Sequence, residues 1–380
     1  MKLHVLGEVF NMHSTTWARA AAATALFSLT LAIWTLLPRE IKAQSNQQAV
    51  GAPKFKVDPF WPQPLPNRWV TGGIGGVCVD AQDHVFILTH GDPNEAEQKV
   101  AVAAPGVIEF DPDGKVVNSW GDRNVLPTSE LHGCFVDYQG NVWISGSRDG
   151  IVQKYSHDGS KMLLQIGTRG KFDTSDGTDK GTPTNSSHTS MNGPTSVTVD
   201  PANGDVYVTD GLRNRRVVVF DRSGNFLRQW GRQATQAETN ARAGGVFQAV
   251  VHCIAMGNDG LVYVCDRWGD RVEVFDKMGN FQKNILLESK DAPPAGLGSD
   301  WIAFSPDKAQ KFMYVVEYGH DAIRIIDHES GQTLSSFGRP GHQAGEFSDP
   351  HMMIVDSKGN IVVGESVHGR RIQMFRFVGN

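Results

Sequence analysis

Three histidines stand at the same place in three repeated segments of the chain. His132, His252 and His351 each lie five residues before the Asp or Gly that closes a short apolar run, namely Asp137, Gly257 and Asp356. Three imidazoles with a fourth position left open are the ligand set of a catalytic zinc site. A single one of the 13 histidines would more often be a surface or core residue. Their shared register instead predicts a zinc centre, provided that the fold brings the three segments together.

The segments that carry these histidines are copies of one unit of roughly 40 residues. The unit is clearest at 193–231, where four apolar runs separated by turn residues predict four antiparallel strands. Six copies can be recognised, at 75–121, 131–167, 193–231, 251–285, 299–338 and 350–377. A sheet this small cannot bury its own faces, so the copies must pack on one another. The sequence therefore predicts an all-β fold, a six-bladed β-propeller around a central channel.

The propeller geometry predicts where the histidines point. They belong to the second, fourth and sixth repeats, and alternate blades of a six-bladed ring are about 120° apart around the axis. Three residues at one repeat position should therefore face a common centre at one mouth of the channel. The other repeats carry Gly75, Thr195 and Asp300 at this position. We expect the two small residues to leave room for a substrate, and Asp300 to contact the substrate or support a metal ligand.

The beginning of the chain is typical of an exported protein. Residues 20–37 are apolar and uncharged, and a small-residue cleavage site follows after Ala43. This pattern predicts that residues 1–43 are a cleaved signal peptide or a retained membrane anchor. In both cases the remaining chain would work outside the cytoplasm, in the periplasm or as a secreted protein.

The rest of the chain is expected to form one domain. Residues 44–71 read as an extended, Pro-rich segment, in which 55–57 would supply the outer strand of the last blade and close the ring. The propeller itself would occupy 72–380. Two long loops, 168–192 and 233–245, are candidates for lids or binding surfaces, and the second is compatible with a short helix.

Composition restricts the partners of the protein. A net charge of -5, from 36 basic and 41 acidic residues, argues against nucleic acid or an anionic membrane surface. We expect instead a small-molecule or peptide substrate, and a monomeric protein. The pattern of the four cysteines assigns no disulfide, although export would permit one, and small buried core residues are the favoured interpretation. These cysteines are Cys78, Cys134, Cys253 and Cys265.

The histidine pattern, together with the run CDRWGDR at 265–271, resembles the peptidyl-α-hydroxyglycine α-amidating lyases, which are six-bladed propellers of NHL repeats. The resemblance covers nearly all of 55–377. It implies that the three histidines hold zinc and that Arg267 is an active-site arginine. It also implies a calcium ion on the channel axis, held by backbone carbonyls that fall by register on Val77, Cys134 and Met352. The implied reaction splits a carbinolamide into an amide and glyoxylate.

Three positions depart from the pattern of that family. Leu212 stands where the family has a catalytic tyrosine, His90 replaces a second arginine, and Asp349 replaces a methionine. Leucine cannot exchange a proton, so another group must do so if the reaction is kept. Tyr318, near the equivalent turn of the fifth repeat, and His90 are the candidates. For Tyr318 the competing interpretation is an aromatic residue packed beside a turn.

Two further sets of charged residues recur near the predicted mouth. Arg213 and Arg215, in a basic cluster with Arg216, could bind a substrate carboxylate together with Arg267, although such a run is more often a solvated loop face. Acidic residues follow the second strand of four repeats, and turn capping explains them without catalysis. They are Asp210, Asp266, Glu317 and Glu365.

The sequence thus predicts an exported, zinc-dependent lyase that resembles the amidating lyases. The alternative is a non-catalytic NHL propeller of the periplasm or cell surface, which would keep the metal site without the tyrosine and bind a partner through the 168–192 loop. A propeller lactonase is less compatible, because those sites use Asp, Glu and Asn around calcium rather than histidines.

Overall fold

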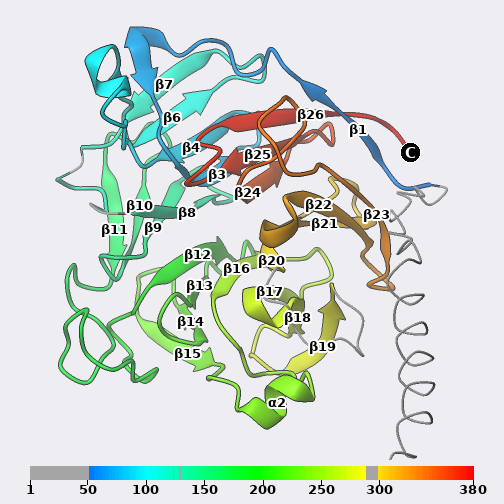
Figure 1. Ribbon diagram of the computed structural model, residues 1–380. Coiled ribbons are helices and arrows are strands. Elements are labelled where there is room, and N and C mark those ends of the chain that lie inside the picture. Colours follow the sequence, from blue (N-terminus) through cyan, green and yellow to red (C-terminus); the bar gives the residue numbers. More distant parts are fainter. Residues whose placement is uncertain (1–50, 123, 128–129, 288–297) are drawn as a thin grey trace, which may run out of the picture. The chain divides into compact units, whose positions relative to one another are not determined.

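Short apolar runs and tight polar turns form six four-stranded antiparallel sheets in the computed structural model (Figure 1). The structure describes residues 51–380 except 123, 128–129 and 288–297. The predicted signal or anchor at 1–43 lies outside the described residues. Within the described part of the chain, no helix is long and apolar enough to span a membrane.

The sheets follow one another along the chain as blades 1 to 6. Blades 1 to 3 consist of β3 (Ile74–Val79), β4 (Val85–Thr89), β6 (Val107–Phe110) and β7 (Val116–Trp120); β8 (Leu131–Val136), β9 (Val142–Gly146), β10 (Ile151–Tyr155) and β11 (Met162–Ile166); and β12 (Pro194–Val199), β13 (Val206–Asp210), β14 (Arg216–Phe220) and β15 (Phe226–Trp230).

Blades 4 to 6 have the same strand order. They consist of β16 (Val251–Met256), β17 (Val262–Asp266), β18 (Arg271–Phe275) and β19 (Phe281–Leu286); β20 (Ser299–Phe304), β21 (Phe312–Glu317), β22 (Ala322–Asp327) and β23 (Thr333–Phe337); and β24 (Pro350–Val355), β25 (Ile361–Glu365), β26 (Ile372–Gly379) and β1 (Lys54–Asp58). The strand β1 pairs antiparallel with β26, so that its residue Phe55 lies opposite Phe377.

The innermost strands arrange the blades in a closed circle. Each of β3, β8, β12, β16, β20 and β24 contacts the innermost strands of both neighbouring sheets, and β24 contacts β3. The first three strands of a blade are largely buried, whereas the outermost strand is half-exposed, as β13 and β15 illustrate. The core therefore lies between neighbouring sheets, and this packing confirms the six-bladed β-propeller.

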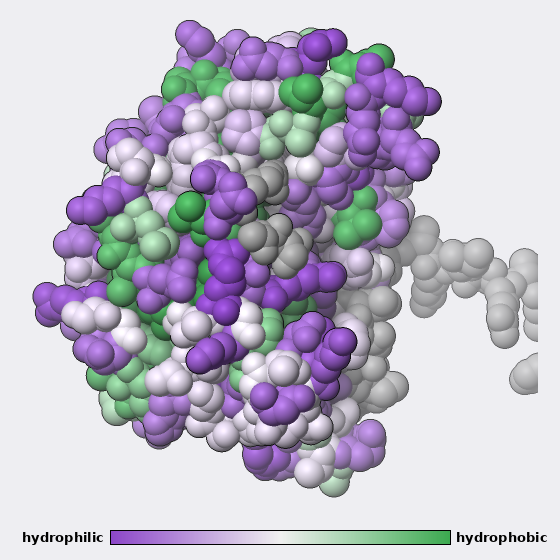
Figure 2. Space-filling model, turned by 90° about the vertical axis from the view of Figure 1, so that its left-hand side faces the viewer, coloured by the Kyte–Doolittle hydropathy of each residue, from purple (hydrophilic) through white to green (hydrophobic). Residues whose placement is uncertain are grey.

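Several short elements lie outside the blades. The strands β2 (Trp69–Val70) and β5 (Val102–Ala103) form a small parallel pair. In the described ranges, 3-10 turns occur at η1 (Pro66–Arg68), η2 (Glu97–Lys99), η3 (Arg267–Gly269) and η4 (Tyr318–His320). The helix expected in 233–245 is present as α2 (Gln236–Asn240), whose N-cap Thr235 and residue Glu238 form a capping box. In Figure 2, hydrophobic residues form scattered patches among hydrophilic ones on the face that is shown.

The cysteines differ from the sequence expectation, because they form two disulfides. Cys78 on β3 bonds Cys134 on β8 and so joins blades 1 and 2, while Cys253 and Cys265 join two strands of blade 4. The first pair is 56 residues apart in the chain. Sequence spacing could not assign these pairs, because the contact between neighbouring innermost strands creates the first one.

Candidate metal centre

The fold places each of the three histidines second in an innermost strand. His132 lies on β8, His252 on β16 and His351 on β24. The pairing of each strand with its neighbour shifts register at this point. A shift of this kind marks a local irregularity of the strand, of which a β-bulge is one form. The ring of innermost strands brings the three imidazoles together.

The three imidazoles form a compact, buried cluster. The ring centroid of His132 lies 4.9 Å from that of His252 and 4.8 Å from that of His351. The centroids of His252 and His351 are 5.0 Å apart. One nitrogen from each ring can be chosen so that all three lie within 4.8 Å of one another. The relative exposures are 3%, 0% and 6%. One cation can therefore contact all three side chains.

Hydrogen bonds and burial prepare the nitrogens to bind a metal. The Nδ1 atoms of His132 and His252 each lie 2.7 Å from a backbone carbonyl, that of Thr195 and that of Asp300. A ring that donates from Nδ1 keeps the lone pair on Nε2. Burial lowers the pKa of His132 to about 4, and it holds the pKa of His252 and His351 well below the usual value. The neutral, lone-pair-bearing form is the one that binds zinc.

A carboxylate and an arginine lie directly beside the cluster. Asp300 is fully buried, and its Oδ2 accepts a hydrogen bond of 2.9 Å from Nη2 of Arg267, whose Nε also contacts the carboxylate. The same carboxylate lies 3.5 Å from Nδ1 of His252 and 4.0 Å from Nε2 of His351. Burial raises the pKa of Asp300 to about 6, while Arg267 opposes the rise. Asp300 thus connects Arg267 to two of the histidines.

The tyrosine predicted as a replacement proton carrier lies at this site. The guanidinium of Arg267 stands over the ring of Tyr318, 4.5 Å from the centroid. Burial, and next the carboxylate of Asp349, raise the pKa of the Tyr318 phenol, whereas Arg267 lowers it. Tyr318 is therefore half-buried against charged groups rather than packed in apolar surroundings. Leu212, which occupies the family's tyrosine position, is half-buried with its backbone N–H bonded to the Gly193 carbonyl.

Asp349, which departs from the family pattern, has a histidine partner, His368, that the sequence did not predict. The structure pairs them, because Nδ1 of His368 contacts Oδ2 of Asp349 and the His368 backbone N–H donates to the same oxygen at 3.1 Å. A chain of polar contacts thus leads from Arg267 through Tyr318 and Asp349 to His368. The only available signal was that Asp349 lies two residues before His351.

His90, the other candidate proton carrier, lies near the histidine cluster. Nε2 of His90 lies 2.9 Å from the place that a Cβ atom on Gly75 would occupy. The charge of His90 lowers the pKa of both His132 and His351. Gly75 itself does not leave room for a substrate, because an added Cβ would lie 1.8 Å from the Leu131 carbonyl.

Thr195, the other small residue at this repeat position, also serves packing. Its buried hydroxyl contacts Oγ1 of Thr209 and the Val251 carbonyl of blade 4, each at 2.8 Å. The expectation that the small residues leave space for a substrate is therefore wrong, since these residues close the seams between blades.

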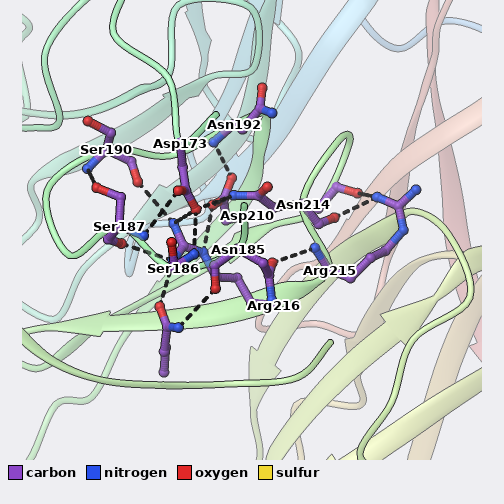
Figure 3. A network of polar contacts seen from close by, with 12 residues as sticks. Asp173, Asn185, Ser186, Ser187, Ser190, Asn192, Asp210, Asn214, Arg215 and Arg216 are labelled. Carbon is purple, nitrogen blue, oxygen red and sulfur yellow. Dashed lines mark hydrogen bonds and ion pairs between the residues drawn. The ribbon is translucent and has the colours of Figure 1, made fainter. Parts of the chain in front are cut away.

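The predicted substrate-binding arginines are committed to the backbone instead. Arg213 is exposed and donates to the Asp179 carbonyl, while Arg215 donates to the carbonyls of Gln248 and Gly211, each at 3.1 Å. Among the described residues, neither is placed in contact with the three histidines. The third member of the run, Arg216, is fully buried and binds the carboxylates of Asp210 and Asp173. This network, drawn in Figure 3, fastens the 168–192 loop to blade 3.

The acidic series has a structural role, as favoured from the sequence. Asp210, Asp266 and Glu365 each accept a backbone N–H from the segment before an innermost strand. All four members also pair with an arginine on the third strand or its start, which the sequence did not reveal. The pairs are Asp210 with Arg216, Asp266 with Arg271, Glu317 with Arg324 and Glu365 with Arg371.

The carbonyls predicted to hold calcium do not share one register. Val77 and Cys134 occupy equivalent positions, but strand pairing makes Met353, rather than Met352, their counterpart in blade 6. Val77, Cys134 and Met353 line a largely apolar cavity of about 590 Å³ in the channel, and Met352 does not. The buried ring of Trp301 also lines this cavity and lies 6.3 Å from His252, centroid to centroid.

Comparison with known proteins agrees with the architecture. Residues 191–220 match the NHL repeat. The chain is 27% identical to peptidyl-glycine alpha-amidating monooxygenase B of Xenopus laevis over 80% of its length and 34% of that protein. It is 26% identical to peptidyl-alpha-hydroxyglycine alpha-amidating lyase 1 of Drosophila melanogaster, over 83% and 58%. The chain thus spans about a third of the length of the amidating monooxygenase.

Two other similarities bear on fold and function. NHL repeat-containing protein 3 of Mus musculus is 26% identical over 85% of this chain and 84% of that protein. A solved structure of streptogramin B lyase covers 86% of this chain and 98% of its own, with a TM-score of 0.54 and 12% identity, and shows the shared fold alone. The chain therefore carries NHL repeats in a six-bladed propeller and is distantly similar to peptide-amidating enzymes.

Proposed function

We propose that the protein is an exported, zinc-dependent lyase that cleaves a carbinolamide or a closely related carbinol substrate. The proposal is carried by the convergence of His132, His252 and His351 in one buried cluster. Nε2 of His252 is buried and has no hydrogen-bond partner among the described residues. An unpaired buried acceptor of this kind is unfavourable unless something binds it. The three neutral imidazoles fit zinc, and when bound it would polarise an oxygen of the substrate.

The surrounding side chains suit an elimination in which a C–N bond breaks. The reaction removes a proton from the carbinol hydroxyl, forms a C=O bond and returns a proton to the departing amide nitrogen. Arg267 is held by Asp300 and is placed to bind a carboxylate or developing negative charge. The raised pKa of Tyr318 keeps its phenol protonated, so it can supply the proton to the nitrogen. His90 is the group that would accept the hydroxyl proton.

Export is supported by the two disulfides together with the apolar segment at 20–37. Disulfides persist in oxidising compartments and are rare in the cytosol. We therefore place the protein in the periplasm or outside the cell, either released from its signal or anchored by it. A structural calcium ion in the channel is part of this proposal, with Val77 and Cys134 as the carbonyl donors.

Metal analysis and a glyoxylate assay test the proposal. In the purified protein, the three-histidine centre of each chain should hold about one zinc ion. The protein should also release glyoxylate from an α-hydroxyglycine amide. His252→Ala should lose both the zinc of this centre and the activity. His342→Ala, which changes an exposed histidine, should lose neither. Equal zinc content in the wild-type protein and in His252→Ala would refute the proposed centre.

A non-catalytic binding protein is the second candidate, and two observations favour it. Leu212 occupies the position of the family's catalytic tyrosine. NHL repeat-containing protein 3 is similar to this chain over 84% of its own length. Zinc bound at the three histidines without turnover of any α-hydroxyglycine amide would favour this candidate over the lyase.

A further inference from the structure

A second cluster of metal-ligating side chains lies at the seam between blades 1 and 2. Asp80 follows β3, His84 precedes β4, Glu109 lies on β6 and His157 follows β10 of blade 2. Ligand atoms of Asp80, Glu109 and His157 all lie within 4.8 Å of one another. Nδ1 of His84 lies 2.7 Å from Oε1 of Glu109, and Nε2 of His157 lies 3.0 Å from Oδ2 of Asp80. Asp80, Glu109 and His157 thus form one cluster, and His84 contacts the glutamate of that cluster.

This cluster is separate from the three-histidine centre. Asp80 directly follows β3, five residues beyond Gly75, and Gly75 holds the repeat position of the three histidines. Five residues of extended strand span roughly 17 Å. The two groups therefore lie toward opposite ends of the innermost strands.

The carboxylates are buried without a lysine or arginine to neutralise them. The side chains of Asp80 and Glu109 are 3% and 6% exposed, and among the described residues only histidines form ion pairs with them. Oδ1 of Asp80 caps its own turn by accepting the backbone N–H groups of Gln82 and His84, which leaves Oδ2 for another partner. Two adjacent buried carboxylates are unfavourable unless cations compensate them.

In two other places, a lysine neutralises the aspartate that corresponds to Asp80. In blade 2, strand pairing makes Asp137 and Lys154 the counterparts of Asp80 and Glu109, and Nζ of Lys154 lies 3.1 Å from Oδ2 of Asp137. Between blades 3 and 4, Nζ of Lys277 lies 2.6 Å from Oδ2 of Asp200. At the seam of blades 1 and 2, a second carboxylate stands where blade 2 has a lysine. This exchange raises the negative charge and adds ligand atoms.

We propose that Asp80, Glu109 and His157 bind a divalent transition-metal ion of the zinc class that joins blade 1 to blade 2, and that His84 supports the ligand Glu109. Mixed imidazole and carboxylate ligands suit zinc, and a doubly charged ion neutralises both buried carboxylates. The ring of His157 is already positioned, because it packs edge-on against Phe86 with centroids 5.2 Å apart. The Cys78–Cys134 disulfide crosses the same seam, so metal and disulfide would reinforce one contact.

Cobalt titration of the full chain tests this second site independently of the first. Metal is stripped with a chelator, the retained fold is checked by circular dichroism, and Co²⁺ is added to His252→Ala, which disables the three-histidine centre. This variant should bind one Co²⁺ with the strong visible absorption of a four-coordinate ion. Adding Glu109→Gln or His157→Ala should weaken that binding at least about 100-fold, by the magnitude expected for metal-site disruption. Adding His342→Ala instead should leave it unchanged.

The outcomes separate the two sites. If His252→Ala binds no Co²⁺, or if its binding survives both Glu109→Gln and His157→Ala, the second site is refuted and the histidines simply form ion pairs with the carboxylates. If wild-type binding is unaffected by His252→Ala and is abolished by Glu109→Gln, the second site stands and the proposed three-histidine centre fails. Glu109→Gln keeps the shape of the side chain, and His157→Ala acts from the other blade, so misfolding of one variant does not decide the result.

Discussion

Few side chains at the candidate centre can transfer a proton. Leucine replaces the tyrosine that the resembling family uses, and the structure instead places Tyr318 beside Arg267 and Asp349. A phenol whose pKa is raised by burial remains a proton donor at neutral pH. The proton donor would thus come from blade 5 rather than blade 3.

Tyr318→Phe tests this assignment. The change removes the phenolic proton but keeps the aromatic ring under the Arg267 guanidinium. We expect kcat to fall by about 10²- to 10⁴-fold, the usual contribution of a positioned acid or base, with zinc content unchanged. Tyr138→Phe, which alters an exposed tyrosine, is the matched control. Unchanged kcat in Tyr318→Phe would remove the tyrosine from the mechanism.

The residues of the site were predictable to different degrees. His132, His252 and His351 could be found because repeat register translates directly into angular position around a ring. The contact between Arg267 of blade 4 and Tyr318 of blade 5 depends on the conformations of two 3-10 turns, which spacing does not encode. Gly75 looked like open space, but its lack of a side chain serves the close approach of the Leu131 carbonyl.

In blades 3, 4 and 6, a buried carboxylate–arginine pair holds the second strand to the loop that precedes the innermost strand. Arg216 is the most connected example, since its guanidinium binds Asp210 and Asp173 as well as the backbone carbonyls of Ser187 and Ser190. The loop at 168–192 is therefore a fastened part of blade 3. The sequence showed the acidic series but not its arginine partners, because a basic residue near a turn is usually solvated.

Arg216→Ala should destabilise the protein strongly. Removing one partner of a buried ion pair leaves uncompensated charge on Asp210 and Asp173 and costs about 3 to 5 kcal/mol. Arg213→Ala, three residues earlier and exposed, should change the free energy of unfolding by less than about 0.5 kcal/mol. Denaturant titration of both variants measures the difference. Equal stability of the two variants would show that the Arg216 network contributes nothing specific.

Blade 4 contains a buried group whose protonation should make stability depend on pH. Glu273 shares Arg271 with Asp266, and burial raises the pKa of Glu273 from 4.5 to about 8. Between these values the folded chain keeps a proton that the unfolded chain has released. The free energy of unfolding should therefore fall as the pH rises from about 4.5 to about 8, by an amount on the order of a few kcal/mol.

Glu273→Gln should flatten this dependence, because glutamine stays uncharged and can still accept the hydrogen bond from the Gly245 backbone N–H. Relative to wild type, the variant should gain stability between about pH 5 and about pH 8.5, as followed by denaturation midpoints. Asp266 titrates in the same direction, since burial raises its pKa to about 6, so some pH dependence will remain. Parallel profiles for the two proteins would contradict the assignment.

The closed ring brings together residues that are far apart in the chain, and the disulfides show how this affects stability. Cys78 and Cys134 are 56 residues apart and join two blades, whereas Cys253 and Cys265 are 12 apart within one blade. Under the chain-entropy account, the longer loop contributes about 4 kcal/mol and the shorter about 3 kcal/mol.

Paired alanine substitutions test this difference. Replacing Cys78 and Cys134 together should lower the denaturation midpoint more than replacing Cys253 and Cys265 together, because the first pair constrains a longer segment. Both double variants remove two buried sulfur atoms, so each controls for lost packing in the other. A larger loss from the blade 4 pair would indicate that strand packing, rather than loop closure, determines the contribution.

The architecture as a whole was largely predictable, because the repeat length and strand number leave few alternatives to a six-bladed propeller. Contacts across the seams were not. The Cys78–Cys134 bond and the cluster around Glu109 both depend on which side chains neighbouring blades place opposite each other. The repeated pattern predicts the strands of each blade. The contacts between blades depend on residues that differ from one repeat to the next, so the pattern does not predict them.

The most direct test of the central claim is anomalous X-ray scattering at the zinc edge from crystals of the purified protein. The account predicts a peak bound by the ring nitrogens of His132, His252 and His351, at roughly 2.0–2.1 Å from each. Crystals of zinc-loaded protein with no anomalous peak among these three imidazoles would contradict it.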